Sequence, residues 1–232
     1  MVNPCFDVGA SDKAVKTLLQ CDFDGTITQE DASFLILDAF GSKDWRQMFE
    51  EYRQGKISVG RFNTMAFATV KADEQTLVEF VKDRARIRPG FHDLVAYCHK
   101  RGFRFVIVSN GLDFYIQAIL RDIGIGNIEV FAAKTRFGAD GIEARYLGPK
   151  GNVVEDSFKE EYLRLFQARG YHVIYAGNGV SDIPPARQAG HVFATGDLLA
   201  YCKETNLNCT PFDDLNDIVR GLPPLSLGNC PR

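Results

Sequence analysis

Three short runs of apolar residues, rich in β-branched side chains, each end abruptly in polar residues. The runs are Val15–Leu19, Phe103–Val108 and Tyr171–Ala176. Continuous apolar runs of this length are typical of strands that are buried on both faces of a parallel sheet. A helix is predicted before the second run, starting near Pro89, and another before the third, at Phe158–Ala168. This alternation predicts an α/β fold with a Rossmann-like parallel sheet as its core.

The segment between the first two runs, residues 29–87, contains no strand-like pattern. Four helical patterns fill it instead, bounded by capping residues and glycines. Their predicted bounds are Asp31–Phe40, Asp44–Arg53, Val59–Thr69 and Glu74–Arg84. We therefore expect a four-helix insert over residues 29–87 in a core made of residues 13–28 and 88–222. The insert is either a cap that closes over a site or an ordinary packing bundle.

A smaller insertion is predicted inside the core at residues 134–156. Two polar-apolar alternating stretches there flank Ala139-Asp140-Gly141, a pattern typical of a β-hairpin with an Asp-Gly turn. We interpret this hairpin as structural. The two ends of the chain, residues 1–12 and 223–232, are expected to be poorly ordered.

Polar side chains suited to phosphate and metal chemistry follow each of the three predicted strands. Asp22 and Asp24 end the first, and because they are two apart on an extended segment they project to one face. The second strand ends in Ser109-Asn110-Gly111 and the third in the stretch Gly177–Asp182. The carboxyl ends of parallel strands lie at one edge of a sheet, so these residues are expected to converge on one site.

Two adjacent carboxylates repel each other and are costly to keep ionised unless a cation lies between them. The pair Asp22 and Asp24 therefore indicates a divalent metal, with one carboxylate as nucleophile and the other as acid and base. The alternative is a solvated strand end that opens an Asp-Gly turn.

Taken in order, the motifs resemble those of the haloacid dehalogenase (HAD) superfamily of phosphatases. They are Asp22-Phe23-Asp24-Gly25-Thr26, Ser109-Asn110-Gly111, a lysine, and Gly177-Asn178-Gly179-Val180-Ser181-Asp182. The resemblance implies the HAD fold, a C1-type cap for residues 29–87, and Mg²⁺-dependent hydrolysis of a small phosphorylated metabolite. It also implies that Asp22 becomes an aspartyl phosphate, while Asp24 protonates the leaving group and then activates water.

The resemblance assigns further roles around this pair. The expected metal ligands are Asp22, Asp24 and Asn178 or Asp182, and the expected phosphate-binding residues are Gly25, Thr26, Ser109, Asn110 and Lys159. Lys159 is favoured over Lys134 and Lys150 because it opens the helix before the last motif strand. Asp182 could instead cap the helix Ile183–Ala189, and Ser109 could simply end a strand.

One position departs from the family pattern. The family usually has aspartate, a direct metal ligand, where this chain has Asn178. An amide oxygen can bind Mg²⁺ but brings no charge. Either Asp182 takes over as ligand or the affinity for metal is weakened.

The cap resembles that of the phosphoserine-phosphatase-like subfamily. Asp31 matches an acidic residue that holds a substrate ammonium, whereas Thr64 stands where an arginine would hold the carboxylate, with Arg61 almost one turn earlier. A neutral threonine cannot replace a bidentate arginine, which argues against phosphoserine. The stretches Tyr52–Ser58, Ser109–Tyr115 and Asp197–Asn208 are similar to the methionine-salvage phosphatases of 2-hydroxy-3-keto-5-methylthiopentenyl-1-phosphate. Four apolar cap residues could receive a thioether tail or could be ordinary packing residues; they are Phe34, Trp45, Phe62 and Phe67.

Composition narrows the class of protein further. The net charge of −3 over 232 residues gives no indication of a nucleic-acid or membrane partner. No apolar run reaches the ~18 residues needed to span a bilayer, and the start of the chain is unlike a signal peptide. The six cysteines form no CxxC pair and are expected to be reduced thiols of a cytoplasmic protein.

The oligomeric state is left open. A non-catalytic HAD-fold phosphate-binding or regulatory protein is the second class of function, although binding alone does not need both Asp22 and Asp24.

Overall fold

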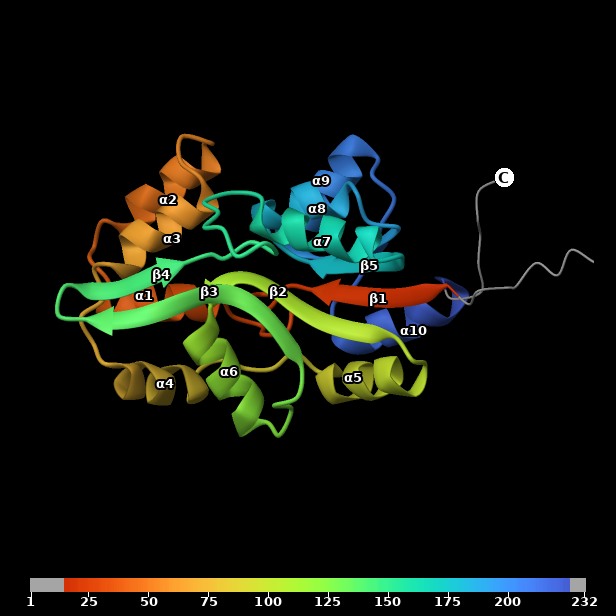
Figure 1. The fold of residues 1–232 in the computed structure, drawn as a ribbon, viewed down its shortest axis with the longest axis horizontal. Coiled ribbons are helices and arrows are strands. Elements are labelled where there is room, and N and C mark those ends of the chain that lie inside the picture. Colours follow the sequence, from red (N-terminus) through yellow and green to blue (C-terminus); the bar gives the residue numbers. More distant parts are fainter. Residues whose placement is uncertain (1–14, 226–232) are drawn as a thin grey trace, which may run out of the picture.

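The computed structural model describes residues 15–225, which form a seven-stranded sheet with helices on both faces (Figure 1). The strand order is β4-β3-β2-β1-β5-β6-β7, and every neighbouring pair is parallel except β3 and β4. The strands are β1 (Lys16–Cys21), β2 (Arg104–Leu112), β3 (Glu129–Gly138), β4 (Gly141–Arg145), β5 (Tyr171–Gly177), β6 (His191–Ala194) and β7 (Thr210–Pro211). The predicted α/β class with a parallel, Rossmann-like core is confirmed.

The helices of the core cover both faces of this sheet. They are α5 (Phe91–Lys100), α6 (Asp113–Asp122), α7 (Phe158–Ala168), α8 (Ile183–Ala186), α9 (Gly196–Thr205) and α10 (Leu215–Leu225). In Figure 1, α5, α6 and α10 lie below the sheet, and α7, α8 and α9 lie above it. Within residues 15–225, none of the helices has the length and apolar character that crossing a membrane would require.

The register of the central strand β1 with its two neighbours determines which residues meet at the edge of the sheet. Cys21 pairs with Ile107 of β2 and with Ala176 of β5. Leu18 and Leu19 are fully buried between the helix layers, so the register cannot slip without moving apolar side chains out of the core. The residues that follow these three strands therefore meet at one edge of the sheet, as predicted.

The four predicted helices of the insert are present. They are α1 (Ala32–Phe40), α2 (Trp45–Arg53), α3 (Val59–Phe67) and α4 (Glu74–Lys82). The side chains of Asp31, Ser58 and Asp73 accept hydrogen bonds from the first turns of α1, α3 and α4, as expected of N-caps. The insert begins and ends at an isolated bridge between Thr28 and Ile87.

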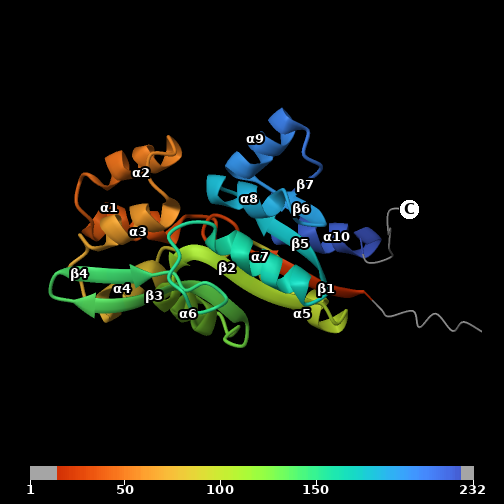
Figure 2. The same cartoon turned by 45° about the horizontal axis from the view of Figure 1, so that its top comes forward.

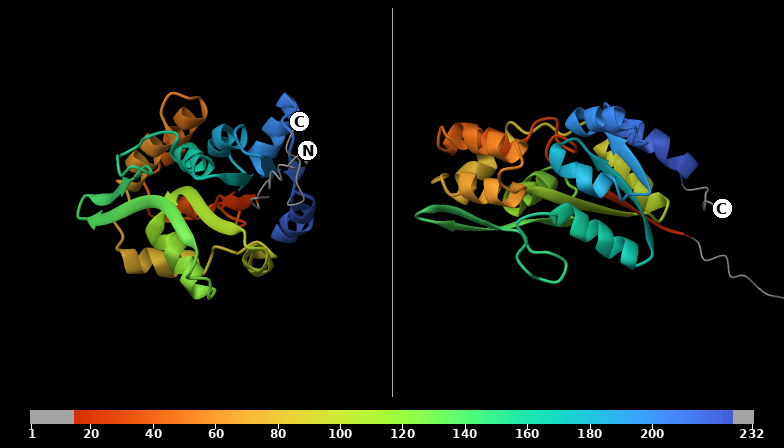
Figure 3. Two further views of the ribbon diagram at one scale, coloured as in Figure 1. Left: turned by 45° about the vertical axis from the view of Figure 1, so that its right-hand side comes forward. Right: turned by 90° about the horizontal axis from the view of Figure 1, so that it is seen from above.

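The helices do not form a closed four-helix bundle. Helices α2 and α3 lie on one side of the β3–β4 hairpin and α4 lies on the other side beside α6, while α1 passes behind the hairpin and contacts α4 (Figures 1 and 2). The hairpin is also more than a surface insertion, because β3 continues directly from the core sheet. Figure 3 shows the hairpin reaching out under the cap helices, where the Thr64 hydroxyl donates to the carbonyl of Ala144 at 3.3 Å.

The predicted tail begins later than expected, because α10 continues to Leu225. The remainder of that segment, 226–232, and the N-terminal segment 1–12 lie outside the described residues.

Candidate active site

Asp22 directly follows β1 and lines a cavity between the core and the helical insert, which is called the cap below. Its backbone N–H donates to the carbonyl of Ala176 at 2.9 Å, so the position of its main chain is set by β5. Lys159 Nζ lies 2.9 Å from Asp22 Oδ1. Burial, with Asp182 adding and Lys159 opposing, raises the pKa of Asp22 to about 7.

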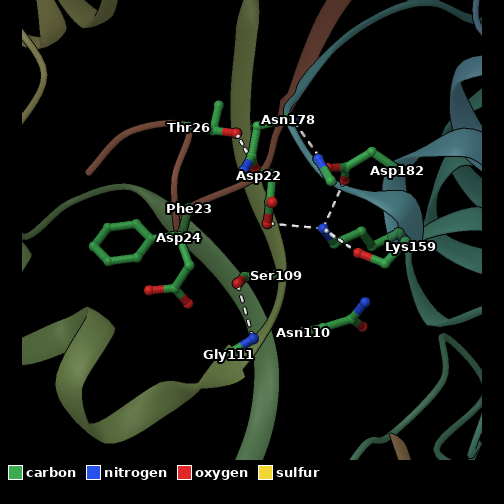
Figure 4. A network of polar contacts seen from close by, with 12 residues as sticks. Asp22, Phe23, Asp24, Thr26, Ser109, Asn110, Gly111, Lys159, Asn178 and Asp182 are labelled. Atoms are coloured by element: carbon green, nitrogen blue, oxygen red, sulfur yellow. Dashed lines mark hydrogen bonds and ion pairs between the residues drawn. The ribbon is translucent and has the colours of Figure 1, made fainter. Parts of the chain in front are cut away.

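Lys159, at the start of α7, is buried between two carboxylates (Figure 4). Its Nζ lies 2.6 Å from Asp182 Oδ1 as well as beside Asp22, and only 3% of its side chain is exposed. Burial alone would lower the pKa of Lys159, but the charges of Asp182 and Asp22 outweigh it and raise that pKa. Gln20 Nε2 donates to the Lys159 carbonyl at 2.8 Å and holds the helix start in place.

The structure supports the choice of Lys159 over its two competitors. Lys134 is 62% exposed and pairs with Asp113 at 3.0 Å, and Lys150 is also exposed. Neither lines the cavity.

Asp182 is fully buried, and both of its carboxylate oxygens already have partners. Oδ1 accepts from Lys159 and, at 2.5 Å, from the Tyr175 hydroxyl. Oδ2 accepts from the N–H groups of Asn178 at 3.0 Å and Gly179 at 2.8 Å. These four partners favour Asn178 over Asp182 as the predicted metal ligand, because the Asp182 carboxylate holds the lysine and the loop after β5. It does not cap the following helix.

Asp24 projects into the same cavity and is held from two sides. The N–H of Ala32 donates to its Oδ1 at 2.9 Å, and the Tyr115 hydroxyl donates to its Oδ2 at 2.5 Å. Burial is the main reason that the pKa of Asp24 is raised well above its usual range, with Asp31 and Asp22 adding to it. A carboxyl group in this setting can retain a proton to give to a leaving group.

The oxygen atoms around Asn178 suit a magnesium ion. The amide atom that faces the site lies 2.9 Å from Thr26 Oγ1, 3.0 Å from the Asp24 carbonyl and 3.3 Å from Asp22 Oδ2. With the nitrogen inward, the amide would donate to all three atoms; with the oxygen inward, it accepts from Thr26. Neighbouring ligands of Mg²⁺, each about 2.1 Å from the metal, lie about 3.0 Å apart in an octahedron. The inward oxygen therefore completes a plausible set with Asp22 and the Asp24 carbonyl.

This donor set carries little negative charge. Among residues 15–225, no group of three or more His, Cys, Asp or Glu side chains could hold a metal ion. The site combines one carboxylate, one backbone carbonyl and one neutral amide, so its affinity for Mg²⁺ is expected to be weaker than that of a site with a second carboxylate.

Ser109 and Asn110 lie in the last four residues of β2, where its pairing with β3 becomes irregular, and both line the cavity. The Ser109 hydroxyl accepts from the N–H of Gly111 at 2.9 Å (Figure 4). The Asn110 carbonyl accepts from Asn63 Nδ2 at 2.8 Å and from the Tyr146 hydroxyl. Its side-chain Oδ1 is buried without a hydrogen-bond partner among the described residues, which leaves it able to accept from a ligand.

Gly25 and Thr26, predicted to bind phosphate, do not line the cavity. The Gly25 N–H lies 3.2 Å from the Thr28 hydroxyl, and the fully buried Thr26 contacts Asn178. Gly25 has φ of +72°, and a Cβ there would collide with the Asn178 amide. In this structure both residues pack against the Asn178 side chain, and their binding to phosphate stays a prediction.

The cavity has a volume of about 170 Å³ and is lined by both the core and the cap. The cap contributes mostly aromatic and apolar side chains, namely Phe34, Phe49, Tyr52, Val59 and Phe62. A neighbouring cavity of about 380 Å³ shares Tyr52, Asn110 and Lys159 with the first. The core side of the site is thus polar and charged, and the cap side is largely apolar.

Of the two predicted substrate-binding residues, one lies at the cavity and the other does not. Asp31 lines the cavity. Burial raises its pKa to about 6, although the backbone hydrogen bonds from Phe34 and Ser33 act in the opposite direction. Arg61 is exposed and lines neither cavity, which gives no support to its predicted contact with substrate. Of the described residues that line the first cavity, Lys159 alone carries a positive charge.

The sequence did not predict Tyr115, Asn63 and Tyr146 as site residues, because tertiary packing rather than any motif brings them to the site.

Comparison with known proteins agrees with this geometry. The family model of the haloacid dehalogenase-like hydrolases matches residues 19–187. A 2-hydroxy-3-keto-5-methylthiopentenyl-1-phosphate phosphatase of Geobacillus thermodenitrificans is 30% identical over 90% of this chain and 97% of its own length. A Bacillus mycoides protein of the same name is 25% identical over 88% and 95%. A structure titled as the phospho-aspartyl intermediate analogue of phosphoserine phosphatase shares the fold, with a TM-score of 0.65 and 20% identity over 89% of this chain and 98% of that one.

The chain therefore belongs to the haloacid dehalogenase-like hydrolases. The HAD resemblance, the HAD fold and the assignment to the phosphatase enzymes of this family are confirmed.

Replacing Asn178 with aspartate tests the donor set directly. The added charge should tighten Mg²⁺ binding by about 10-fold or more, measured by isothermal titration calorimetry. Asn127→Asp, in the exposed loop between α6 and β3, is the control and should leave the affinity unchanged. Equal affinities for wild type and Asn178→Asp would contradict the placement of Asn178 at the metal.

Removing the buried cation should destabilise the fold. Lys159→Ala leaves Asp22 and Asp182 without their shared partner, so the free energy of unfolding in urea should fall by about 3–5 kcal/mol. Lys134→Ala breaks an exposed pair and should cost about 1 kcal/mol or less. Similar losses for the two variants would show that Lys159 does not hold the site together.

Proposed function

We propose that this protein is a Mg²⁺-dependent phosphatase that hydrolyses a small phosphate monoester through an aspartyl phosphate on Asp22. The observation that carries the proposal is the setting of that carboxylate. It lies in a cavity with Lys159 on one oxygen and the Asn178 amide near the other. A nucleophile in this setting can approach an anionic phosphate because positive charge is already beside it.

The reaction follows from the two aspartates. Asp22 attacks phosphorus and forms a P–O bond, while the bond to the leaving oxygen breaks and Asp24 gives that oxygen its proton. A water molecule then attacks the phosphorus, Asp24 takes its proton, and inorganic phosphate leaves with Asp22 restored. A bound Mg²⁺, held by Asp22, the Asp24 carbonyl and Asn178, would offset the like charges of nucleophile and phosphate.

The phosphoryl oxygens would be bound by groups at the ends of β2 and α7. The Ser109 hydroxyl, the Asn110 side chain and the Lys159 ammonium all line the cavity beside Asp22. Lys159 would stabilise charge on both Asp22 and the transferring group, since Asp182 fixes its position.

The cap favours a substrate whose remaining part is neutral and partly apolar. The cavity wall opposite Asp22 is aromatic, and it offers no arginine or second lysine among the described residues for a carboxylate. These features support the methylthio-ketopentenyl phosphate for which the relatives are named. Phosphoserine is the alternative metabolite: Asp31 could hold its ammonium, but no cation in the cavity other than Lys159 faces its carboxylate.

We further propose a cytoplasmic location. The four cysteines of the described segment, Cys21, Cys98, Cys202 and Cys209, are all free thiols, as is usual in a reducing compartment.

Asp22→Asn should abolish the reaction. Hydrolysis of p-nitrophenyl phosphate in Mg²⁺ should fall at least about 10³-fold, and removal of metal from the wild type with EDTA should have a similar effect. Asp93→Asn, exposed on α5, should retain full activity. A folded wild type that binds phosphate but turns over no ester with any divalent metal would favour the non-catalytic alternative.

Substrate ranking tests the role of the cap. The methylthio-ketopentenyl phosphate should exceed phosphoserine in kcat/KM by about 100-fold or more, because a buried carboxylate without a cation is strongly disfavoured. A higher kcat/KM for phosphoserine would contradict this assignment while leaving the phosphatase chemistry intact.

A further inference from the structure

The side chain of Asp24 is fixed by two groups that belong to no motif of the sequence. One is the N–H of Ala32, the first residue of α1 in the cap, and the other is the hydroxyl of Tyr115 on α6 in the core. Tyr115 is fully buried, and only 8% of Asp24 is exposed. The proposed acid is thus held between the cap and the core.

Two hydrogen bonds join the Tyr115 hydroxyl to its neighbours. A phenol has only one proton to donate, and Tyr115 donates it to Asp24 Oδ2 at 2.5 Å. The Ser33 hydroxyl lies 2.7 Å from the phenol oxygen and is able to donate to it. A chain of hydrogen bonds therefore joins Ser33 in the insert, through Tyr115, to Asp24.

The space around this chain is closed. A Cβ at position 111 would collide with both the Tyr115 hydroxyl and Asp24 Oδ2, so Gly111 is what allows the two groups to meet. The Tyr115 ring also packs edge-on against Phe114, with ring centroids 5.4 Å apart. The packing around the ring thus holds the phenol against the carboxylate, which faces the cavity on its other side.

A proton donor must be directed at the leaving oxygen, and a displacement of about 1 Å can cost about 100-fold in rate. We propose that Tyr115 is a positioning residue that holds Asp24 in its proton-transfer orientation and, through Ser33, links that orientation to the cap. This proposal rests on the proposed function, in which Asp24 is the acid and base. Tyr115 itself does not line the cavity and acts only through Asp24.

Two esters that differ in their need for a proton test this role. Phenolate is a poor leaving group and needs protonation, whereas p-nitrophenolate leaves readily without it. In Tyr115→Phe, kcat/KM for phenyl phosphate should fall about 10- to 100-fold, and kcat/KM for p-nitrophenyl phosphate should change by less than about 3-fold. The ratio of the two values is the readout, because a general loss of structure would lower both alike.

Three further variants make the test specific. Tyr162→Phe removes another mostly buried hydroxyl, which donates to the Leu147 carbonyl at 3.0 Å, and should leave both values unchanged. Ser33→Ala keeps the bond from Tyr115 to Asp24 and should give a smaller, but equally selective, loss for phenyl phosphate. In an Asp24→Asn background, adding Tyr115→Phe should cause no further selective loss, because the group being positioned is already gone.

The outcomes distinguish a failure of the role proposed for Tyr115 from a failure of the proposed phosphatase function. Equal losses for both esters in a folded Tyr115→Phe protein, or a selective loss that persists in the Asp24→Asn background, would overturn the role of Tyr115 alone. If Tyr115→Phe does not fold, Ser33→Ala decides: a selective loss supports the link to the cap, and its absence overturns it. A wild type that hydrolyses neither ester contradicts the proposed function, and the role of Tyr115 falls with it.

Discussion

The ion pair of Lys159 with Asp22 and Asp182 is the contact on which the rest of the site depends. Two carboxylates this deeply buried would be costly to ionise on their own, and one ammonium between them offsets both charges. Asp182 also holds the loop after β5 through the N–H groups of Asn178 and Gly179. The same arrangement thus fixes Lys159 beside Asp22 and positions the loop that carries Asn178.

The core side of the site is charged, and the cap side is largely apolar. The core supplies the groups to which we assign attack and phosphate binding, close to strand ends whose register is fixed by buried side chains. The cap supplies the aromatic wall over the cavity and, through Ala32, one of the two bonds to Asp24. Because cap residues support the acid directly, the seating of the cap and the chemistry of the core are joined by hydrogen bonds as well as by a shared cavity.

The sequence was informative where local patterns fix geometry. Apolar runs and capping residues predicted the three central strands and all four helices of the insert, but not β6 or β7. Parallel strand ends predicted that Asp22, Ser109 and Asn178 would meet. It could not show the partners of Asp182 or the support of Asp24 by Tyr115, because those contacts join segments far apart in the chain. The position of α4 beside α6 was missed for the same reason, since a helical pattern does not say which neighbour a helix packs against.

The account is tested most directly by trapping the covalent intermediate. Wild-type enzyme turning over a ³²P-labelled phosphate ester should be quenched in acid, digested and its peptides mapped by mass spectrometry. Radioactivity should be found on the peptide that contains Asp22, with the label on that side chain. Measurable turnover with the label on another residue, or with no labelled peptide under conditions in which an acyl phosphate survives, would contradict the account.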